Sequence, residues 1–181
     1  NAVAEERLGG NMDYIRNETS NRYYEETTSH RYSAQLSIDH ALNETNRLAV
    51  KQSISYFNRN LSTPGYVFEG KQVNSFTEAN YSRHGETAEW VAGINVWNEE
   101  FDEAPHSNTA VRSFKQNTVG VFLQNTFKAN EWLHFESGVR GDYVNNYGFA
   151  FLPRIAVLLK PSAAFSSRIG GGMGYKAPTI F

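Results

Sequence analysis

Few side chains in this 181-residue chain could perform chemistry, and cysteine is absent. The five histidines stand far apart in the sequence: His30, His40, His84, His106 and His134. None of them has the spacing that gathers several ligands around a zinc ion. His106 lies near Asp102 and Glu103 in a long polar stretch, so it is a weak candidate for a ligand or metal contact. We otherwise expect no catalytic centre, no metal site and no cofactor.

Two short motifs look functional but fit a strand better. Gly170-Gly171-Gly172 lacks the lysine and the following helix of a phosphate-binding loop. We expect it to allow close packing or bending within a strand. Arg140-Gly141-Asp142 spells a cell-adhesion tripeptide, yet it lies in the middle of an alternating stretch. Neither motif therefore indicates an enzyme or an adhesion site.

The stretch from residue 147 to 181 predicts two long strands joined by a tight turn at Lys160-Pro161-Ser162. Side chains of a strand alternate between its two faces. One face of this hairpin is apolar: Phe149, Phe151, Pro153, Ile155, Val157, Leu159, Phe165, Ile169, Met173 and Tyr175. The opposite face mixes small and polar residues with Arg154 and Arg168. Such a pair of faces suits either a soluble sandwich or a membrane barrel.

The same alternation recurs along the chain, and no run has the period of an amphipathic helix. Together with the final hairpin it predicts about nine strands, the earlier ones near residues 9–17, 31–42, 47–59, 73–82, 88–97, 118–128 and 133–143. The connections near residues 44, 85, 130 and 161 are expected to be tight. Longer loops are expected at residues 18–29, 61–70 and 99–116, and only the short connection near residue 147 breaks this rule.

Tight turns at one end of the strands and long loops at the other are typical of bacterial outer-membrane barrels. Aromatic residues near the strand ends fit the girdles of such barrels: Tyr56, Tyr81, Trp90, Tyr143 and Tyr175. No apolar run reaches the ~18–20 residues of a membrane helix. With 17 basic and 19 acidic residues, the chain has no charge excess that favours nucleic acid.

We therefore expect an all-β fold: an antiparallel up-and-down meander of long strands that forms part of a larger transmembrane β-barrel. Two alternatives stay open at this point. One is a soluble or surface-exposed β-sandwich used for binding or adhesion. The other is a plug-free porin or a β-barrel enzyme of the outer membrane. The sandwich would bury its apolar faces against each other, whereas the barrel would expose them as one band.

Several motifs resemble the TonB-dependent outer-membrane receptors. They are Phe151-Leu152-Pro153-Arg154-Ile155-Ala156-Val157, Lys160-Pro161, Gly174-Tyr175-Lys176-Ala177-Pro178-Thr179, Gly120-Val121-Phe122-Leu123-Gln124 and Gly138-Val139-Arg140-Gly141-Asp142-Tyr143. The resemblance is strongest over residues 117–179 and weaker over 33–103. Gly141 departs from the pattern, because the family often has an aromatic or other large residue there.

The resemblance implies a 22-stranded barrel that is filled by a plug domain and lies in the bacterial outer membrane. Such receptors take up scarce ligands, such as ferric siderophores, haem, cobalamin or glycans, with energy relayed by TonB. Residues 1–181 would be a partial β-barrel domain, without the plug domain, the TonB-contacting segment and the last strands. The implied partners are TonB, the receptor's own plug, membrane lipid and a small-molecule or metal-chelate ligand, with no nucleic acid.

Arginines on the polar face carry the most specific expectation. If the last two turns are centred near residues 147 and 161, Arg140 lies opposite Arg154, and Arg154 lies opposite Arg168. Like charges that face each other on a sheet are unfavourable by up to ~1 kcal/mol. Glu136 and Asp142 share this face but lie two or more rows away. We hypothesise that the arginine row contacts carboxylates of the plug, the alternative being that solvated arginines splay apart.

Overall fold

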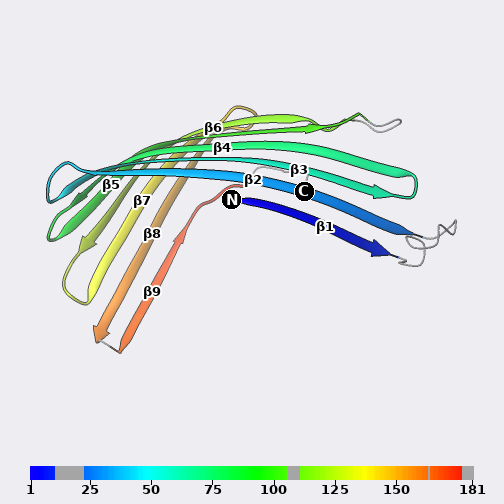
Figure 1. Ribbon diagram of the computed structural model, residues 1–181. Coiled ribbons are helices and arrows are strands. Elements are labelled where there is room, and N and C mark those ends of the chain that lie inside the picture. The colour runs from blue at the N-terminus through cyan, green and yellow to red at the C-terminus, as the bar shows by residue number, and fades with distance from the viewer. Residues whose placement is uncertain (11–22, 106–110, 163, 177–181) are drawn as a thin grey trace. The chain divides into compact units, whose positions relative to one another are not determined.

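The computed structural model describes residues 1–10, 23–105, 111–162 and 164–176. They form one nine-stranded antiparallel sheet in which each strand pairs with its neighbours in the sequence (Figure 1). The strands are β1 (Ala2–Gly10), β2 (Tyr24–Ala41), β3 (Asn46–Thr63), β4 (Tyr66–His84), β5 (Ala88–Glu103), β6 (Phe114–Lys128), β7 (Leu133–Val144), β8 (Gly148–Ser162) and β9 (Phe165–Gly172). The expected all-β meander is confirmed.

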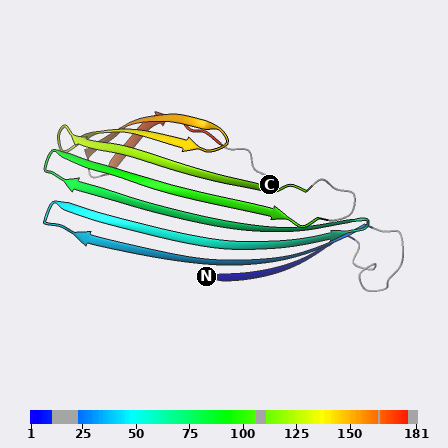
Figure 2. The same cartoon turned by 90° about the horizontal axis from the view of Figure 1, so that it is seen from above.

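The chain divides into two compact units. Unit 1 holds residues 1–35, 53–75 and 98–115, and unit 2 holds residues 36–52, 76–97 and 116–181. Strands β2 to β5 contribute residues to both units. The two longest connections, β1–β2 and β5–β6, belong to unit 1, whereas the tight β2–β3, β4–β5 and β6–β7 turns belong to unit 2 (Figure 2).

Side-chain amides close the tight turns of unit 2. In the β2–β3 turn, the Asn43 side-chain oxygen accepts a hydrogen bond from the Thr45 amide at 3.0 Å. In the β6–β7 turn, the Asn130 side-chain oxygen accepts one from the Trp132 amide at 3.1 Å. Asparagine favours such turns because its side chain can bond to the backbone two residues further on. The expected turns near residues 44 and 130 are therefore confirmed, with a local physical cause.

Some residues expected to form loops extend the strands instead. The loop predicted for residues 61–70 is wrong, because β3 runs to Thr63 and β4 begins at Tyr66. Only Pro64 and Gly65 remain between them, and Gly65 has a φ of 80°. A type II turn requires a positive φ at its third residue, where glycine is favoured, and proline is common at its second residue.

The ends of β1, β2, β5 and β6 also differ from expectation. β2 already begins at Tyr24, within the predicted loop of residues 18–29. The predicted loop of residues 99–116 shortens to the connection between Glu103 and Phe114. A strand was expected at residues 9–17, but β1 ends at Gly10, and residues 11–17 lie outside the described part of the chain.

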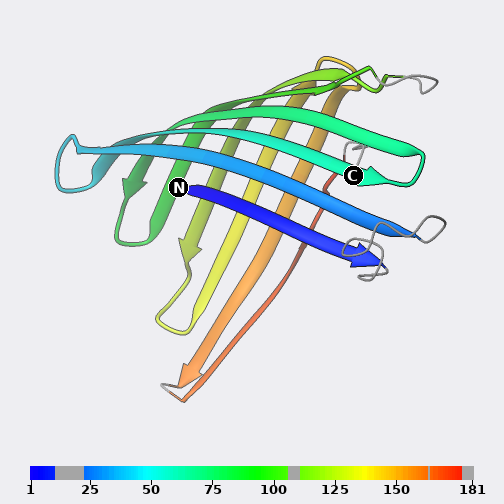
Figure 3. The same ribbon diagram turned by 45° about the vertical axis from the view of Figure 1, so that its right-hand side comes forward.

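Large apolar side chains at alternating positions of unit 2 remain exposed, and we call the side they share the apolar face. They are Leu36, Ile38, Leu42, Leu48, Val50, Tyr81, Trp90, Ile94, Val119, Val121, Leu123, Phe127, Phe135, Val139, Tyr143, Phe149, Phe151, Ile155 and Ile169. On β6 they run from Val119 to Phe127, and on β7 from Phe135 to Tyr143. Each run covers about the ~9–11 residues that a tilted strand needs to cross a bilayer. Figure 3 shows β6 to β9 side by side in the order of the sequence.

A polar residue within the apolar face has a partner. Gln52 lies among the exposed apolar residues of β3, and its side-chain oxygen accepts a hydrogen bond from the Thr77 hydroxyl of β4. An unpaired amide would be costly in hydrocarbon, because no water is present to bond with it. The pairing across two strands therefore suits an apolar environment.

The same side of the strands becomes polar in unit 1. Tyr32 stacks on Tyr56, with ring centroids 6.4 Å apart. Beyond this pair the alternating positions are mainly polar: Glu26, Thr28, His30, Asn58, Asn60, Glu69, Lys71, Asn98, Glu100 and Asp102. A tyrosine pair beside polar positions in unit 1 resembles the aromatic girdles of membrane barrels.

Gly141 has a neighbour that fills the space of its missing side chain. A Cβ atom at Gly141 would lie 3.0 Å from ring carbons of Phe149 on the adjacent strand. An aromatic ring laid over a strand glycine shields the backbone and supplies packing that glycine lacks. Phe149 therefore stands in for the large residue that the family pattern has at this position.

The described residues bury only four apolar side chains: Phe68, Phe101, Val144 and Ala156. So few cannot form the core of a two-layer sandwich, which joins the inner faces of both sheets. The sandwich alternative is therefore wrong, since the apolar side chains form an exposed band on one sheet. No helix among the described residues is long and apolar enough to span a membrane.

Candidate functional site

The side of unit 2 opposite the apolar face, here called the inner face, carries a buried polar network. Arg140 donates from Nε to both carboxylate oxygens of Asp142, at 2.7 and 2.9 Å. Its Nη2 donates to the Asn95 side-chain oxygen at 3.2 Å. The Tyr175 hydroxyl donates to Asp142 Oδ2 at 3.1 Å. Asp142 is only 2% exposed, so these donors replace the water that its charge would otherwise bind.

A glycine leaves room for this network. A Cβ atom at Gly120 would collide with Asp142 Oδ1 and would lie 2.7 Å from Asn95 Oδ1. The residue on β6 that pairs with Asp142 must therefore lack a side chain. The expectation that Arg140 and Asp142 share one face is confirmed, whereas the close ion pair between them was not foreseen.

Tyr175 does not belong to an aromatic girdle on the apolar face. That expectation is wrong, because the Tyr175 hydroxyl reaches Asp142 on the inner face. β9 ends at Gly172, so the strand alternation no longer fixes the direction of Tyr175. Tyr81, Trp90 and Tyr143 do lie exposed on the apolar face near strand ends.

The predicted row of opposed arginines is also wrong. Arg140 pairs with Leu152, and Arg168 pairs with Leu158. Arg168 instead forms an ion pair with Glu136 on the same face. Arg140 and Arg168 thus each form an ion pair with a carboxylate of this sheet. The three arginines do not pair with one another across the strands.

Arg154 is the exception among the inner-face arginines. It pairs with Gly138 on β7 and with Gly172 on β9, so glycine flanks it on both sides. Within the described part of the chain, no carboxylate lies within ion-pair distance of it, and the residue is exposed. Arg154 and Arg140 both line a pocket of about 460 Å³. The arrangement leaves the Arg154 guanidinium available to a partner outside these strands.

A second polar cluster, in unit 1, joins the two stems of the β5–β6 connection. Arg112 donates from Nη2 and Nε to the two carboxylate oxygens of Glu103, both at 2.7 Å, and its amide donates to the same carboxylate at 2.9 Å. Nη2 also lies 3.2 Å from the Tyr66 hydroxyl. These hydrogen bonds, that of Glu103 first, raise the pKa of the Arg112 guanidinium. We call this arrangement the Glu103 clasp.

Aromatic rings support the Glu103 clasp. Phe101 stacks between Phe68 and Phe114, at centroid distances of 6.4 and 5.7 Å, and Arg112 lies over the Phe68 ring. A Cβ atom at Gly70 would lie 2.7 Å from the Phe68 ring, so glycine is needed there. The sequence analysis missed this cluster, because it assigned these residues to loops. The spacing of aromatics at alternating positions was the signal that could have revealed it.

Removing the charge of Glu103 should loosen the β5–β6 connection. In Glu103→Gln the bidentate contact to Arg112 is lost, and we expect several-fold faster amide exchange at Ala104 and at residues 111–113. Hydrogen–deuterium exchange of the complete receptor would measure this. Glu100→Gln is the matched control, because the Glu100–Lys115 pair is exposed and such pairs contribute little. Equal exchange in both variants would contradict a structural role for the clasp.

No group of three or more potential metal ligands occurs among the described residues. His106, the weak candidate for a ligand or metal contact, lies outside the described residues. His84 approaches Glu89 at 3.9 Å, and Lys128 forms the closer contact to that carboxylate at 2.6 Å. Glu89 and Lys128 therefore form an ion pair between β5 and β6, and His84 of β4 lies beside it.

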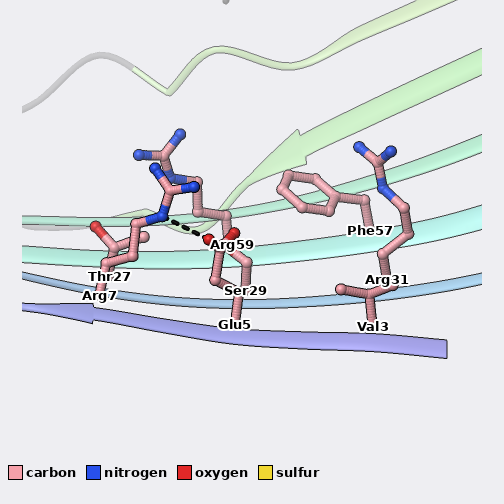
Figure 4. Close-up of a pocket in the computed structure, with 8 residues that line it drawn as sticks. All are labelled: Val3, Glu5, Arg7, Thr27, Ser29, Arg31, Phe57 and Arg59. Carbon is pink, nitrogen blue, oxygen red and sulfur yellow. Dashed lines mark hydrogen bonds and ion pairs between the residues drawn. The ribbon is translucent and has the colours of Figure 1, made fainter.

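The sequence analysis also missed an arginine-rich pocket in unit 1. Arg7, Arg31 and Arg59 line a cavity of about 420 Å³ between β1, β2 and β3 (Figure 4). The three residues are far apart in the sequence, and only the β1–β2 pairing brings Arg7 and Arg31 onto one side.

One sheet with an exposed apolar band and a charged, hydrogen-bonded inner face defines the wall of a transmembrane β-barrel. The family model described as "TonB dependent receptor-like, beta-barrel" matches residues 4–181. The chain belongs to this family, whose members are bacterial outer-membrane receptors and are transporters, not enzymes.

Solved structures share the fold. The alcaligin outer-membrane receptor FauA from Bordetella pertussis aligns with a TM-score of 0.68 and 12% identity, covering 93% of this chain and 31% of that one. The siderophore receptor PirA from Pseudomonas aeruginosa gives 0.66 and 12%, covering 99% and 31%. The RagAB peptide importer gives 0.59 and 12%, covering 76% and 20%. The chain spans about a third or less of these receptors. No curated protein matches it.

Proposed function

We propose that this chain forms part of the barrel wall of a receptor that imports a scarce ligand across the outer membrane, with energy relayed by TonB. The observation that supports this most is the inner face, where Arg154 is exposed between two glycines and has no carboxylate partner among the described strands. A barrel wall that encloses a plug needs unpaired polar or charged side chains, such as Arg154, that point toward the plug. The ligand is a small molecule or metal chelate of the siderophore, haem, cobalamin or glycan kind.

The rest of the receptor would supply what nine strands cannot. Both edge strands of the sheet need partners, because unpaired edges promote association with other chains. Further barrel strands, a plug domain and a segment that contacts TonB complete the transporter in this proposal, and membrane lipid covers the apolar face. The solved receptors, roughly three times as long as their match to this chain, support such an assembly.

Ligand-dependent growth tests the transport function. Cells that depend on the complete receptor for a scarce nutrient should grow only when both the receptor and TonB are present. A receptor that restored growth equally well in cells without TonB would instead be a plug-free porin. Uptake of a radiolabelled ligand in the two strains would measure the same difference directly.

Reversing the charge of Arg154 should weaken the contact with the plug. In Arg154→Glu we expect repulsion between the new carboxylate and acidic plug residues, so that the plug is held less firmly or ligand uptake falls. Loosening would appear as higher cell sensitivity to an antibiotic too large for porins. Uptake assays would detect the second effect.

Arg83→Glu is the matched control for this charge reversal. Arg83 is exposed near the β4–β5 turn, at a position that alternation places on the apolar side of β4. The Arg83→Glu substitution should change neither plug retention nor ligand uptake. If Arg154→Glu also left both unchanged, the plug contact would be disproved, and Arg154 would be a solvated lumen residue.

A further inference from the structure

A single charged residue lies among the strand positions of the apolar face of unit 2. Side-chain alternation assigns to this face one arginine, Arg83, and no lysine, aspartate or glutamate among the residues of unit 2 that the structure describes. Arg83 is exposed and is the last residue but one of β4. A charge on the lipid side of a barrel costs least near the membrane surface. The position of Arg83 therefore fits the level of the lipid headgroups.

Arg83 lies at the end of unit 2 that has the tight turns. Only residues 85–87 connect β4 to β5. Bacterial barrels have their short turns on the periplasmic side and their longer loops outside. The periplasmic leaflet of an outer membrane consists of phospholipids, whereas lipopolysaccharide is confined to the outer leaflet. A headgroup that reaches Arg83 is therefore that of a phospholipid.

Two aromatic side chains flank Arg83 on the apolar face. The Gly85 amide donates a hydrogen bond to the Ala88 carbonyl at 3.0 Å. Antiparallel pairing in this register places Trp90 of β5 opposite Arg83. Tyr81 precedes Arg83 by two residues, so it lies on the same face. Both aromatic residues are exposed, and tryptophan and tyrosine prefer the headgroup level of a bilayer.

Hydrogen bonds fix the Tyr81 side chain before any lipid binds. Its hydroxyl donates to Asn46 Oδ1 of β3 at 2.7 Å. Asn46 Nδ2 in turn donates to Asn43 Oδ1 in the β2–β3 turn at 2.9 Å. A side chain that is already ordered loses less conformational entropy when a ligand packs against it. The Tyr81 ring is therefore a prepared wall beside Arg83.

Arg83 and Trp90 keep free hydrogen-bond donors. Among the described residues, no carboxylate lies within ion-pair distance of Arg83, and Glu89 of β5 pairs with Lys128 instead. The Trp90 indole N–H, which can only donate, has no acceptor in the same part of the chain. A guanidinium can bind a phosphate through two parallel hydrogen bonds. The two neighbouring side chains thus offer donors to one phosphate group.

We propose that Arg83, Trp90 and Tyr81 form a binding site for the phosphodiester group of an anionic phospholipid in the periplasmic leaflet. The Arg83 guanidinium binds the phosphate oxygens, the Trp90 N–H donates to a further oxygen, and the Tyr81 ring packs against the glycerol part of the lipid. A phospholipid that carries an ammonium group gains less, because the strand positions of this face in the described part of unit 2 offer no carboxylate to it. The site faces away from the lumen, so it is separate from the plug contact of Arg154.

Photocrosslinking of the complete receptor in phosphatidylcholine nanodiscs tests the site. The probes are phosphatidylglycerol and phosphatidylethanolamine that carry the same photoreactive group near the glycerol, and mass spectrometry measures labelling of the peptide that covers residues 81–90. We expect several-fold more labelling by the phosphatidylglycerol probe in the wild-type receptor. This labelling should fall about fivefold in Arg83→Gln and about twofold in Trp90→Phe, which keeps a ring but removes the N–H donor. Higher salt should also reduce it.

Arg47→Gln is the matched control. Arg47 is exposed near the same tight-turn end, but alternation places it on the opposite side of β3. Labelling by phosphatidylglycerol should therefore stay at the wild-type level in this variant. Equal labelling by the two probes in the wild-type receptor would overturn the proposal, since the site would not distinguish headgroup charge. Equal phosphatidylglycerol labelling in Arg83→Gln and Arg47→Gln, or wild-type labelling in Trp90→Phe, would overturn the site as defined.

Discussion

An arginine at position 121 is expected to destabilise the folded barrel by about 2–4 kcal/mol, which is the cost of a charged side chain on the lipid face near the bilayer midplane. Val121 is the middle residue of β6 and is 55% exposed on the apolar face. In Val121→Arg the guanidinium would have to leave water for hydrocarbon or bend toward the membrane surface. The midpoint of urea unfolding in lipid vesicles would measure this loss.

Gln124→Arg on the same strand is the control. Gln124 is exposed on the opposite side of β6 and lines the inner-face pocket. A charge placed there stays in water, so we expect a change of less than about 1 kcal/mol. Equal losses in the two variants would mean that the two sides of β6 face the same environment, and the barrel wall would be contradicted.

Replacing Asp142 by alanine is expected to cost about 2–4 kcal/mol. Removing one partner of a buried ion pair leaves the other charge without compensation. The effect is moderated because the Arg140 side chain remains 37% exposed. Asn95 and Tyr175 would also lose their connection to the network. The same urea unfolding assay should show the loss of stability. Tyr175 should also be held less firmly, because its hydroxyl loses its acceptor on Asp142.

A double substitution separates the lost pair from the lost packing. In Arg140→Leu with Asp142→Leu no buried charge remains, so much of the stability should return. Glu136→Gln provides a comparison, because the Arg168 partner of Glu136 is 49% exposed and the loss there should be smaller. A double variant as unstable as Asp142→Ala would show that the lost contacts with Asn95 and Tyr175, and not the uncompensated charge of Arg140, cause the instability.

Alternation of side chains carried most of the information about the fold. The face assignments of residues 149–159 were correct even though the strand pairing was not. The β7–β8 turn centres one residue earlier than expected, and Pro161 lies within β8, so the last connection follows Ser162 instead of centring on Pro161. Both shifts change the partner of Arg154 by an even number of residues, and an even shift preserves the face of every side chain.

The pairing itself could not be predicted in this way. Register depends on the turn geometry, and a Lys-Pro-Ser segment reads equally well as a turn or as the end of a strand. The bulge between Leu159 and Ser162 has no clear signature in the residue types. For this reason the arginine row was misplaced, while the shared face of Arg140, Arg154 and Arg168 was correct.

The polar ends of the long strands were missed for a different reason. Among residues 61–70 only Phe68 is a buried apolar side chain, so little apolar alternation marks this stretch. Backbone hydrogen bonds hold these segments together, and the backbone pattern is invisible in a sequence. The Glu103 clasp lies in such segments, and only the alternating aromatic residues around it gave a signal. Arg31 and Arg59 of the arginine-rich pocket lie in expected strands, but the β1–β2 pairing that brings Arg7 beside them could not be predicted.

Cysteine scanning along β8 tests the barrel wall most directly. These 181 residues contain no cysteine, so single cysteines from Phe149 to Leu158 would each report one position once any cysteine elsewhere in the complete receptor is replaced. Labels at Phe149, Phe151 and Ile155 should be quenched from within the lipid, and labels at Ala150, Leu152 and Arg154 by a water-soluble quencher. A transmembrane wall predicts this alternation with a period of two residues. Aqueous quenching of both sets to the same extent would contradict it.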